Sequence, residues 1–244
     1  MQKFSLKRRK YDLIISIGEV CYCSSSIRKF NLQKYSYPFD WVFGADLESR
    51  INIIKNKFSN FFELKDLEYK YSQDNLYVIH NNRTGINFIH DFLISKGPWK
   101  GQYNEVCAKY ERRCDRVLDL LTSNQKKKIL LVYIKHHTFD LKGDYTNQEL
   151  ENLMKDLEQI YPNKEFNILF LEHNENYKPD KFDYIEYSDK VKRVILYNKP
   201  QYKEDTSIHA GCLKNTHIAL SYWNLSLKKS FFRRLFMSIK ILFF

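Results

Sequence analysis

The stretch "IISIGEVCYCSSSIRKF", residues 14–30, decides the fold, because an apolar run ends at a glycine and a helical pattern begins within a few residues. The run "YDLIISI" at 11–17 is rich in β-branched residues and predicts a buried strand. Residues 22–31 predict a helix. We therefore expect a strand, a tight turn at Gly18 and a helix with Cys21 in its first turn.

The same alternation of apolar strands and helices continues along the chain. Apolar residues spaced three or four apart predict helices at 45–57, 103–122 and 147–160, and apolar runs predict strands at 126–135, 165–174 and 192–199. This order is typical of an α/β layered fold with a largely parallel sheet. The segment 65–94 instead has "NNRTG" between two alternating runs, so we expect an antiparallel insertion there.

Cysteine content and charge limit the class of protein. Five cysteines without framework spacing argue against a disulfide-stapled secreted domain and indicate a reducing, cytoplasmic compartment. The net charge is +11, and residues 1–10 and 226–244 each hold five Lys or Arg and no acid. Removing these ten charges leaves +1 for residues 11–225, so no nucleic-acid groove is expected there.

We therefore expect three parts: a basic arm at 1–10, one α/β domain at 11–225 and a basic amphipathic helix at 226–244. The last segment places aromatic and aliphatic residues on one helical face and most basic residues on the other. Five charges argue against a membrane-spanning helix, whereas an interfacial helix on an anionic leaflet fits. We expect peripheral attachment at the inner face of the plasma membrane. The alternative is a helix packed on the body or on a second subunit.

Cys21 has two interpretations. At a helix N-terminus the free N–H groups and the dipole stabilise a thiolate, and a nearby imidazole would add to this effect. Alternatively, Cys21 and Cys23 are both small core residues, since free cysteines are among the most buried residue types. Cys23 should point into the core in either case. No second cysteine pair at ligand spacing is present, so we expect neither a metal nor a cofactor.

Residues 16–41, "SIGEVC" followed by "SIRKFNLQKYSYPFDW", resemble the opening motif of a bacterial family of papain-like cysteine peptidases, whose members often lie near surface-polysaccharide genes. Further similar motifs are "FIHDF" at 88–92, "KYERRCDRVLDLL" at 109–121 and "KHHT" at 135–138. The resemblance covers residues 11–200. It implies an α+β papain-like fold as the alternative to the layered parallel sheet.

Carried over residue by residue, the resemblance implies Cys21 as the nucleophile and His90 as the base. An orienting carboxylate would be Asp40 or Asp91. Asp91 adjoins His90 and would face the opposite way on a strand, so Asp40 is the better candidate. The alternative role of Asp40 is that of a turn carboxylate that caps the next segment.

Substrate contacts are expected from Trp41, Asp91, Arg112 and His137. If the strands are parallel, their carboxyl ends bring His137 to the same rim as Cys21, and Arg112 suits a phosphate. The chain departs from the family pattern after the middle strand, where Lys135 and a doubled histidine stand in place of an arginine and one histidine.

The sequence thus predicts a papain-like cysteine hydrolase or acyl transferase that acts on a small-molecule or glycan-linked substrate in surface-polysaccharide biosynthesis. One alternative is a glycosyltransferase-like enzyme of capsule or lipopolysaccharide synthesis that binds a nucleotide sugar through Asp40, His90 and Arg112. The other is a non-catalytic scaffold at the membrane surface.

Overall fold

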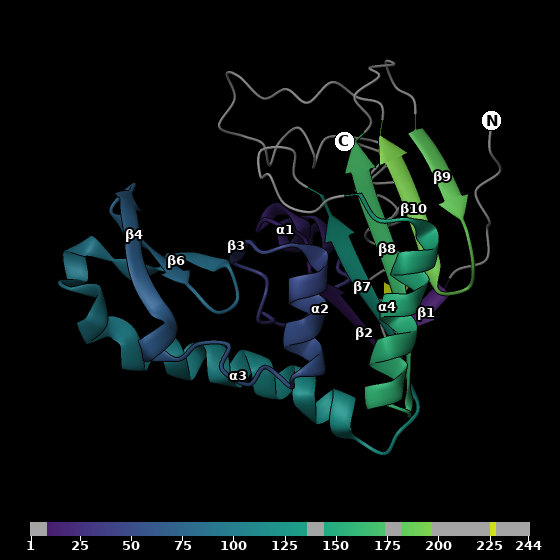
Figure 1. Cartoon of the computed structure of the whole chain (residues 1–244), viewed down its shortest axis with the longest axis horizontal. Helices are drawn as coiled ribbons and strands as arrows, with labels where there is room; N and C mark the ends of the chain where they lie inside the picture. Colours follow the sequence, from purple (N-terminus) through teal and green to yellow (C-terminus); the bar gives the residue numbers. More distant parts are fainter. Residues whose placement is uncertain (1–8, 136–143, 174–181, 197–224, 228–244) are drawn as a thin grey trace.

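The computed structural model describes residues 9–135, 144–173, 182–196 and 225–227 (Figure 1). Its main sheet has five strands in the order β2-β7-β8-β10-β9. These strands are β2 (Leu13–Ser16), β7 (Lys127–Ile134), β8 (Lys164–His173), β10 (Val191–Leu196) and β9 (Phe182–Glu186). The pairs β2–β7, β7–β8 and β8–β10 are parallel, and β9 runs antiparallel to β10. The predicted largely parallel sheet is confirmed.

Both faces of this sheet are buried. Alternate residues of β7 point to opposite faces, so Leu130 and Val132 join one hydrophobic cluster while Ile129 and Leu131 join the other. The helices that cover the sheet are α1 (Tyr22–Lys29), α2 (Leu47–Lys55) and α4 (Asn147–Ile160). α1 contributes to the first cluster, and α2 and α4 contribute to the second. The helix that begins at Cys21 therefore lies across the sheet from α2 and α4.

A second sheet is antiparallel, in the order β3-β6-β5-β4. Its strands are β3 (Val42–Gly44), β6 (Ile86–Leu93), β5 (Leu76–Asn81) and β4 (Leu67–Gln73). The long helix α3 (Tyr103–Thr122) runs beneath it (Figure 1). Aromatic rings fill the space between sheet and helix; for example, the Phe62 and Tyr110 rings stack with centroids 4.7 Å apart. The predicted antiparallel insertion at 65–94 is confirmed.

Local signals account for several element ends. Thr146 and Glu149 form a capping box at the start of α4, as their spacing predicts. Three short 3-10 helices connect elements of the second sheet and α3: Leu64–Asp66, Ile94–Lys96 and Trp99–Gln102. The strands β3 and β9 are not predicted by the sequence, because both are short and β3 continues a loop without an alternating pattern.

The two basic segments are described only where they meet the body. β1 (Arg9–Tyr11) pairs in parallel with β11 (Leu225–Leu227). The remaining residues of the basic arm and of the 226–244 segment lie outside the described residues. Within the part of the chain that the structure describes, no helix is long and apolar enough to cross a membrane.

Candidate active site

The turn that precedes α1 lies tightly against the end of β7. The amide of Glu19 donates to the carbonyl oxygen of Ile134 at 3.3 Å. A Cβ atom at Gly18 would lie 2.6 Å from Cβ of Cys23 and 3.0 Å from the backbone nitrogen of Ile134. Position 18 therefore has to be glycine for α1 to start this close to the sheet.

Cys21 and Cys23 are two residues apart but have different surroundings. Cys23 is fully buried, its thiol donates to the carbonyl oxygen of Val132 at 3.3 Å, and burial raises its pKa to about 11. Cys21 is the N-cap residue of α1 and is half-buried. Cys23 is therefore the core residue that the sequence predicts, whereas Cys21 is only partly buried.

Burial also raises the pKa of the Cys21 thiol, and a hydrogen bond with its own backbone offsets this only in part. A position at a helix N-terminus would by itself lower the pKa of a thiol, so burial has the larger effect on Cys21. A raised pKa favours the neutral thiol over the thiolate, so a nucleophilic role for Cys21 would require a base that removes this proton.

Asp40 is fully buried inside its own loop. Its Oδ2 accepts hydrogen bonds from the Arg28 guanidinium at 2.7 Å, from the Tyr37 amide at 2.8 Å and from the Gln33 side-chain amide. Within the described residues, these groups and not His90 are its hydrogen-bond partners. Burial raises the pKa of Asp40, and the bonds from Tyr37 and Arg28 lower it. The carboxylate thus holds the 33–41 loop against α1.

His90 is exposed and is connected to α1 through Trp41. The His90 and Trp41 rings meet edge to face with centroids 5.9 Å apart. The Arg28 guanidinium lies 5.4 Å from the centroid of the Trp41 ring, and its Nε donates to Ser24 Oγ at 3.2 Å. His90 and Trp41 therefore lie near Arg28, which belongs to the last turn of α1 and follows Cys21 by seven residues.

Asp91 faces away from His90, as expected for neighbours in a strand. Its side chain is only 2% exposed, forms an ion pair with Lys109 and accepts a hydrogen bond from the Tyr110 hydroxyl at 2.6 Å. Both partners belong to α3. Asp91 therefore attaches β6 to α3, and its carboxylate is not available to orient the His90 ring.

The two remaining candidates are Arg112 and His137. Arg112 is exposed on α3, whereas Arg113 is buried, with its guanidinium 4.9 Å from the Tyr110 ring centroid. His137 lies outside the described residues, so its substrate contact remains a prediction. Among the residues that the structure places, no group of three or more His, Cys, Asp or Glu side chains could hold a metal ion.

A buried polar cluster beside the Cys21 turn is missing from the sequence-based predictions. Glu19 is buried and accepts a hydrogen bond from the Tyr133 hydroxyl. The fully buried Arg50 donates to the carbonyl oxygens of Glu19 at 3.4 Å, Ala45 at 3.2 Å and Gly44. Burial lowers the pKa of Arg50 to about 10. An arginine within the apolar stripe of α2 is the sequence signal that points to this cluster.

Most of the chain can be aligned with known proteins. Over 209 residues it is 28% identical to "Uncharacterized protein R408" of Acanthamoeba polyphaga mimivirus, an alignment that spans 77% of this chain and 90% of that protein. This relative is viral, so it lends no support to the bacterial origin that the resemblance implies. No solved structure matches the chain. Residues 12–176, which include Cys21, Asp40 and His90, match the family described as "Putative papain-like cysteine peptidase (DUF1796)", and the chain belongs to that family.

Proposed function

We propose that this protein is a cysteine-dependent hydrolase in which Cys21 is the nucleophile and His90 is the general base. One observation carries the proposal: the exposed His90 ring packs on Trp41, and Trp41 contacts Arg28 of the helix that begins at Cys21. This contact supports an imidazole from the second sheet near the last turn of α1, the helix whose N-cap is the half-buried Cys21. Membership of a papain-like cysteine peptidase family supports the same pair of residue types.

The raised pKa of Cys21 defines the first chemical step. His90 takes the thiol proton as Sγ attacks the carbonyl carbon of an ester or amide. A thioester forms, and the leaving oxygen or nitrogen departs with the proton from the imidazole. Water then attacks the thioester with His90 again as base, which releases the acid and restores the thiol.

Asp40 acts as a positioning residue in this proposal. Its bonds to Arg28 and to the Tyr37 amide hold the loop that ends at Trp41 against α1. Asp40 thus places Trp41, and Trp41 in turn places His90. Asp40→Asn should raise KM and lower kcat together, while the rate of alkylation at Cys21 stays the same as in the unmodified chain. A general loss of folding would instead change the alkylation rate as well.

The substrate class can also be proposed. We infer a glycan-linked ester or amide substrate in surface-polysaccharide biosynthesis, with transfer of the acyl group to a sugar hydroxyl as the alternative to hydrolysis. Residues 226–244 support a location at an anionic membrane, because they hold five Lys or Arg and no acid. Each such residue near an anionic surface contributes about 1 kcal/mol. Co-sedimentation of the full chain with phosphatidylglycerol vesicles, but not with phosphatidylcholine vesicles, tests this location.

The central test uses a panel of p-nitrophenyl esters and an electrophilic thiol probe on the full chain. We expect a burst of p-nitrophenolate followed by slower turnover, because the acyl-enzyme accumulates. Cys21→Ala should abolish both the burst and the labelling of this position. His90→Gln should slow acylation by about 100-fold to 10,000-fold, the usual contribution of a general base.

Matched variants are Cys107→Ala, which removes another half-buried thiol, and His80→Gln, which removes a histidine bonded to Asn87 at 3.0 Å. Both should keep the burst. Undiminished labelling after Cys21→Ala, or a burst that does not depend on His90, would overturn the assignment. Binding of a nucleotide sugar without any ester burst would favour the glycosyltransferase-like alternative.

A further inference from the structure

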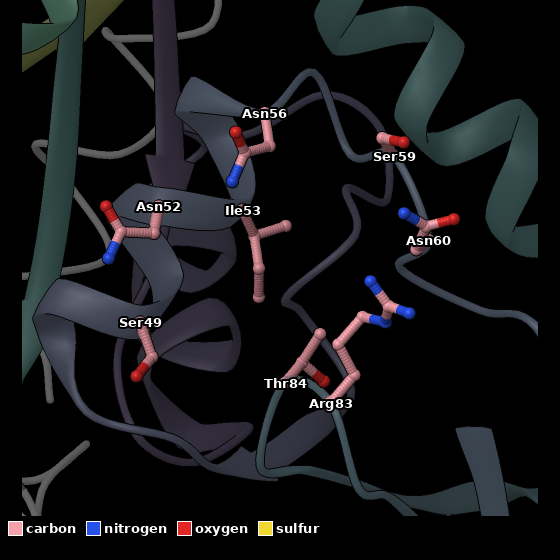
Figure 2. Close-up of a pocket in the computed structure, with 8 residues that line it drawn as sticks. All are labelled: Ser49, Asn52, Ile53, Asn56, Ser59, Asn60, Arg83 and Thr84. Carbon is pink, nitrogen blue, oxygen red and sulfur yellow. The ribbon is translucent and has the colours of Figure 1, made fainter.

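A polar hollow that the proposed mechanism does not use lies between α2, the segment that follows α2 and the β5–β6 turn (Figure 2). Its volume is about 440 Å³, within the range of roughly 300–1,000 Å³ typical of small-molecule sites. Its lining includes Asn52, Ile53, Asn56, Asn60, Arg83 and Thr84, together with two serines. Ile53 is the single apolar side chain among these residues, and Arg83 is the single charged one.

One buried side chain, Asn81, joins two walls of the hollow. Its Oδ1 accepts hydrogen bonds from the amides of Arg83 and Thr84, both at 2.9 Å. Its Nδ2 donates to the carbonyl oxygen of Phe61 at 3.0 Å, and the residue is fully buried. The β5–β6 turn is therefore fixed relative to the loop after α2, so the hollow is formed before any ligand arrives.

The loop after α2 adopts an unusual backbone conformation. Lys57, Phe58 and Asn60 have φ values of 54°, 57° and 60°, in the left-handed region that non-glycine residues rarely occupy. Phe58 anchors this loop, because its ring packs edge to face on Phe61 with centroids 6.0 Å apart. Such strained conformations persist where surrounding contacts hold them, and they cluster at binding sites.

The lining chemistry suits a sugar. Each asparagine side chain offers one acceptor and two donors, and each serine or threonine hydroxyl both donates and accepts. A sugar hydroxyl also does both, so neighbouring hydroxyls can pair with these groups in either direction. The three asparagines come from two elements, and Figure 2 shows them spread around the hollow.

Arg83 supplies donors for an anionic group. It forms an ion pair with Asp66, which accepts a hydrogen bond from its Nε at 3.0 Å and fixes the side chain by one edge. The two terminal nitrogens then remain for a phosphate or carboxylate, which guanidinium groups bind through paired hydrogen bonds. We propose that this hollow binds an anionic sugar, a monosaccharide that carries a phosphate or carboxylate group.

Calorimetric titration of the full chain tests the proposal with glucose 6-phosphate, glucuronate, glucose and inorganic phosphate. We expect saturable binding of at least one anionic sugar, about tenfold or more tighter than glucose or inorganic phosphate, because hydroxyl and anion contacts act together. Arg83→Gln and Asn56→Ala should each weaken that binding by about tenfold, the former through the anion and the latter through the sugar ring.

Arg116→Gln is the matched control, because it removes an exposed arginine from α3, and it should leave the affinity unchanged. Unchanged melting temperatures of all three variants show that folding is intact. The proposal is overturned if none of the four compounds binds saturably, if Arg83→Gln and Asn56→Ala bind as tightly as Arg116→Gln, or if inorganic phosphate or glucose alone binds as tightly as the anionic sugar.

Discussion

The turn before α1 and the Trp41–His90 pair of the second sheet supply the two halves of the proposed site, and they are built in opposite ways. At the turn, Glu19 and Arg50 are buried and hydrogen-bonded, and Gly18 permits close packing. In the second half, Trp41 is half-buried and His90 is exposed. Changes at the turn should therefore cost stability, whereas changes at Trp41 and His90 should alter activity and leave the fold intact.

The largest expected effect is at Arg50. Arg50→Met keeps the length of the side chain but removes the donors to the carbonyl oxygens of Glu19, Gly44 and Ala45. Leaving several buried acceptors unpaired should lower the free energy of unfolding by about 3–5 kcal/mol, as measured by urea denaturation. Arg83→Met, at an exposed arginine, should cost less than about 1 kcal/mol. Equal losses for the two variants would contradict the difference between the two regions.

Gly18→Ala should have the next largest effect. The added methyl group would meet Cβ of Cys23 at 2.6 Å and its Sγ at 2.9 Å, so the start of α1 has to move. Overpacking of this kind costs about 1–3 kcal/mol. The control is Gly101→Ala, because a Cβ there has no atom within 4 Å. Similar denaturation midpoints for the two alanine variants would show that the turn tolerates movement.

Two neighbouring residues of β6 offer a test within one strand. Asp91→Ala removes the buried partner of Tyr110 and Lys109, and should lower the free energy of unfolding by about 1–3 kcal/mol. His90→Ala removes an exposed ring and should change the free energy of unfolding by less than about 0.5 kcal/mol, while slowing acylation by about 100-fold to 10,000-fold. A stability loss at His90 as large as that at Asp91 would mean that the ring is structural.

Much of the fold could be predicted because its signals are local. The β-branched run of β2, the apolar stripe of α3 and the capping box of α4 each depend on residues close in sequence. The parallel order follows from strands that alternate with helices. β9 could not be predicted, because an edge strand pairs on one side only and its residues need not form a continuous apolar run.

The candidate site was less predictable because its contacts are long-range. The sequence places Cys21 at the start of a helix, but the pKa of its thiol depends on burial, which follows from tertiary packing. Asp40 lies in a motif with polar neighbours, and its bonds to Arg28 and Gln33 cannot be derived from spacing. The role of Arg50 depends on carbonyl groups from two separate turns.

The last and smallest expected effect is the pH dependence of alkylation at Cys21. Burial raises the pKa of this thiol, so at pH 7 the folded chain holds less thiolate than the unfolded chain. Iodoacetamide should therefore react more slowly with Cys21 in the folded chain than in urea, and the rate should rise as pH increases through the raised pKa.

Peptide mass spectrometry follows each cysteine separately, and Cys23, with a pKa of about 11 and a fully buried thiol, serves as the unreactive reference. A rapid reaction that is already constant below pH 7 would instead reveal a preformed thiolate–imidazolium pair, and the base would then act before substrate binding and not during attack.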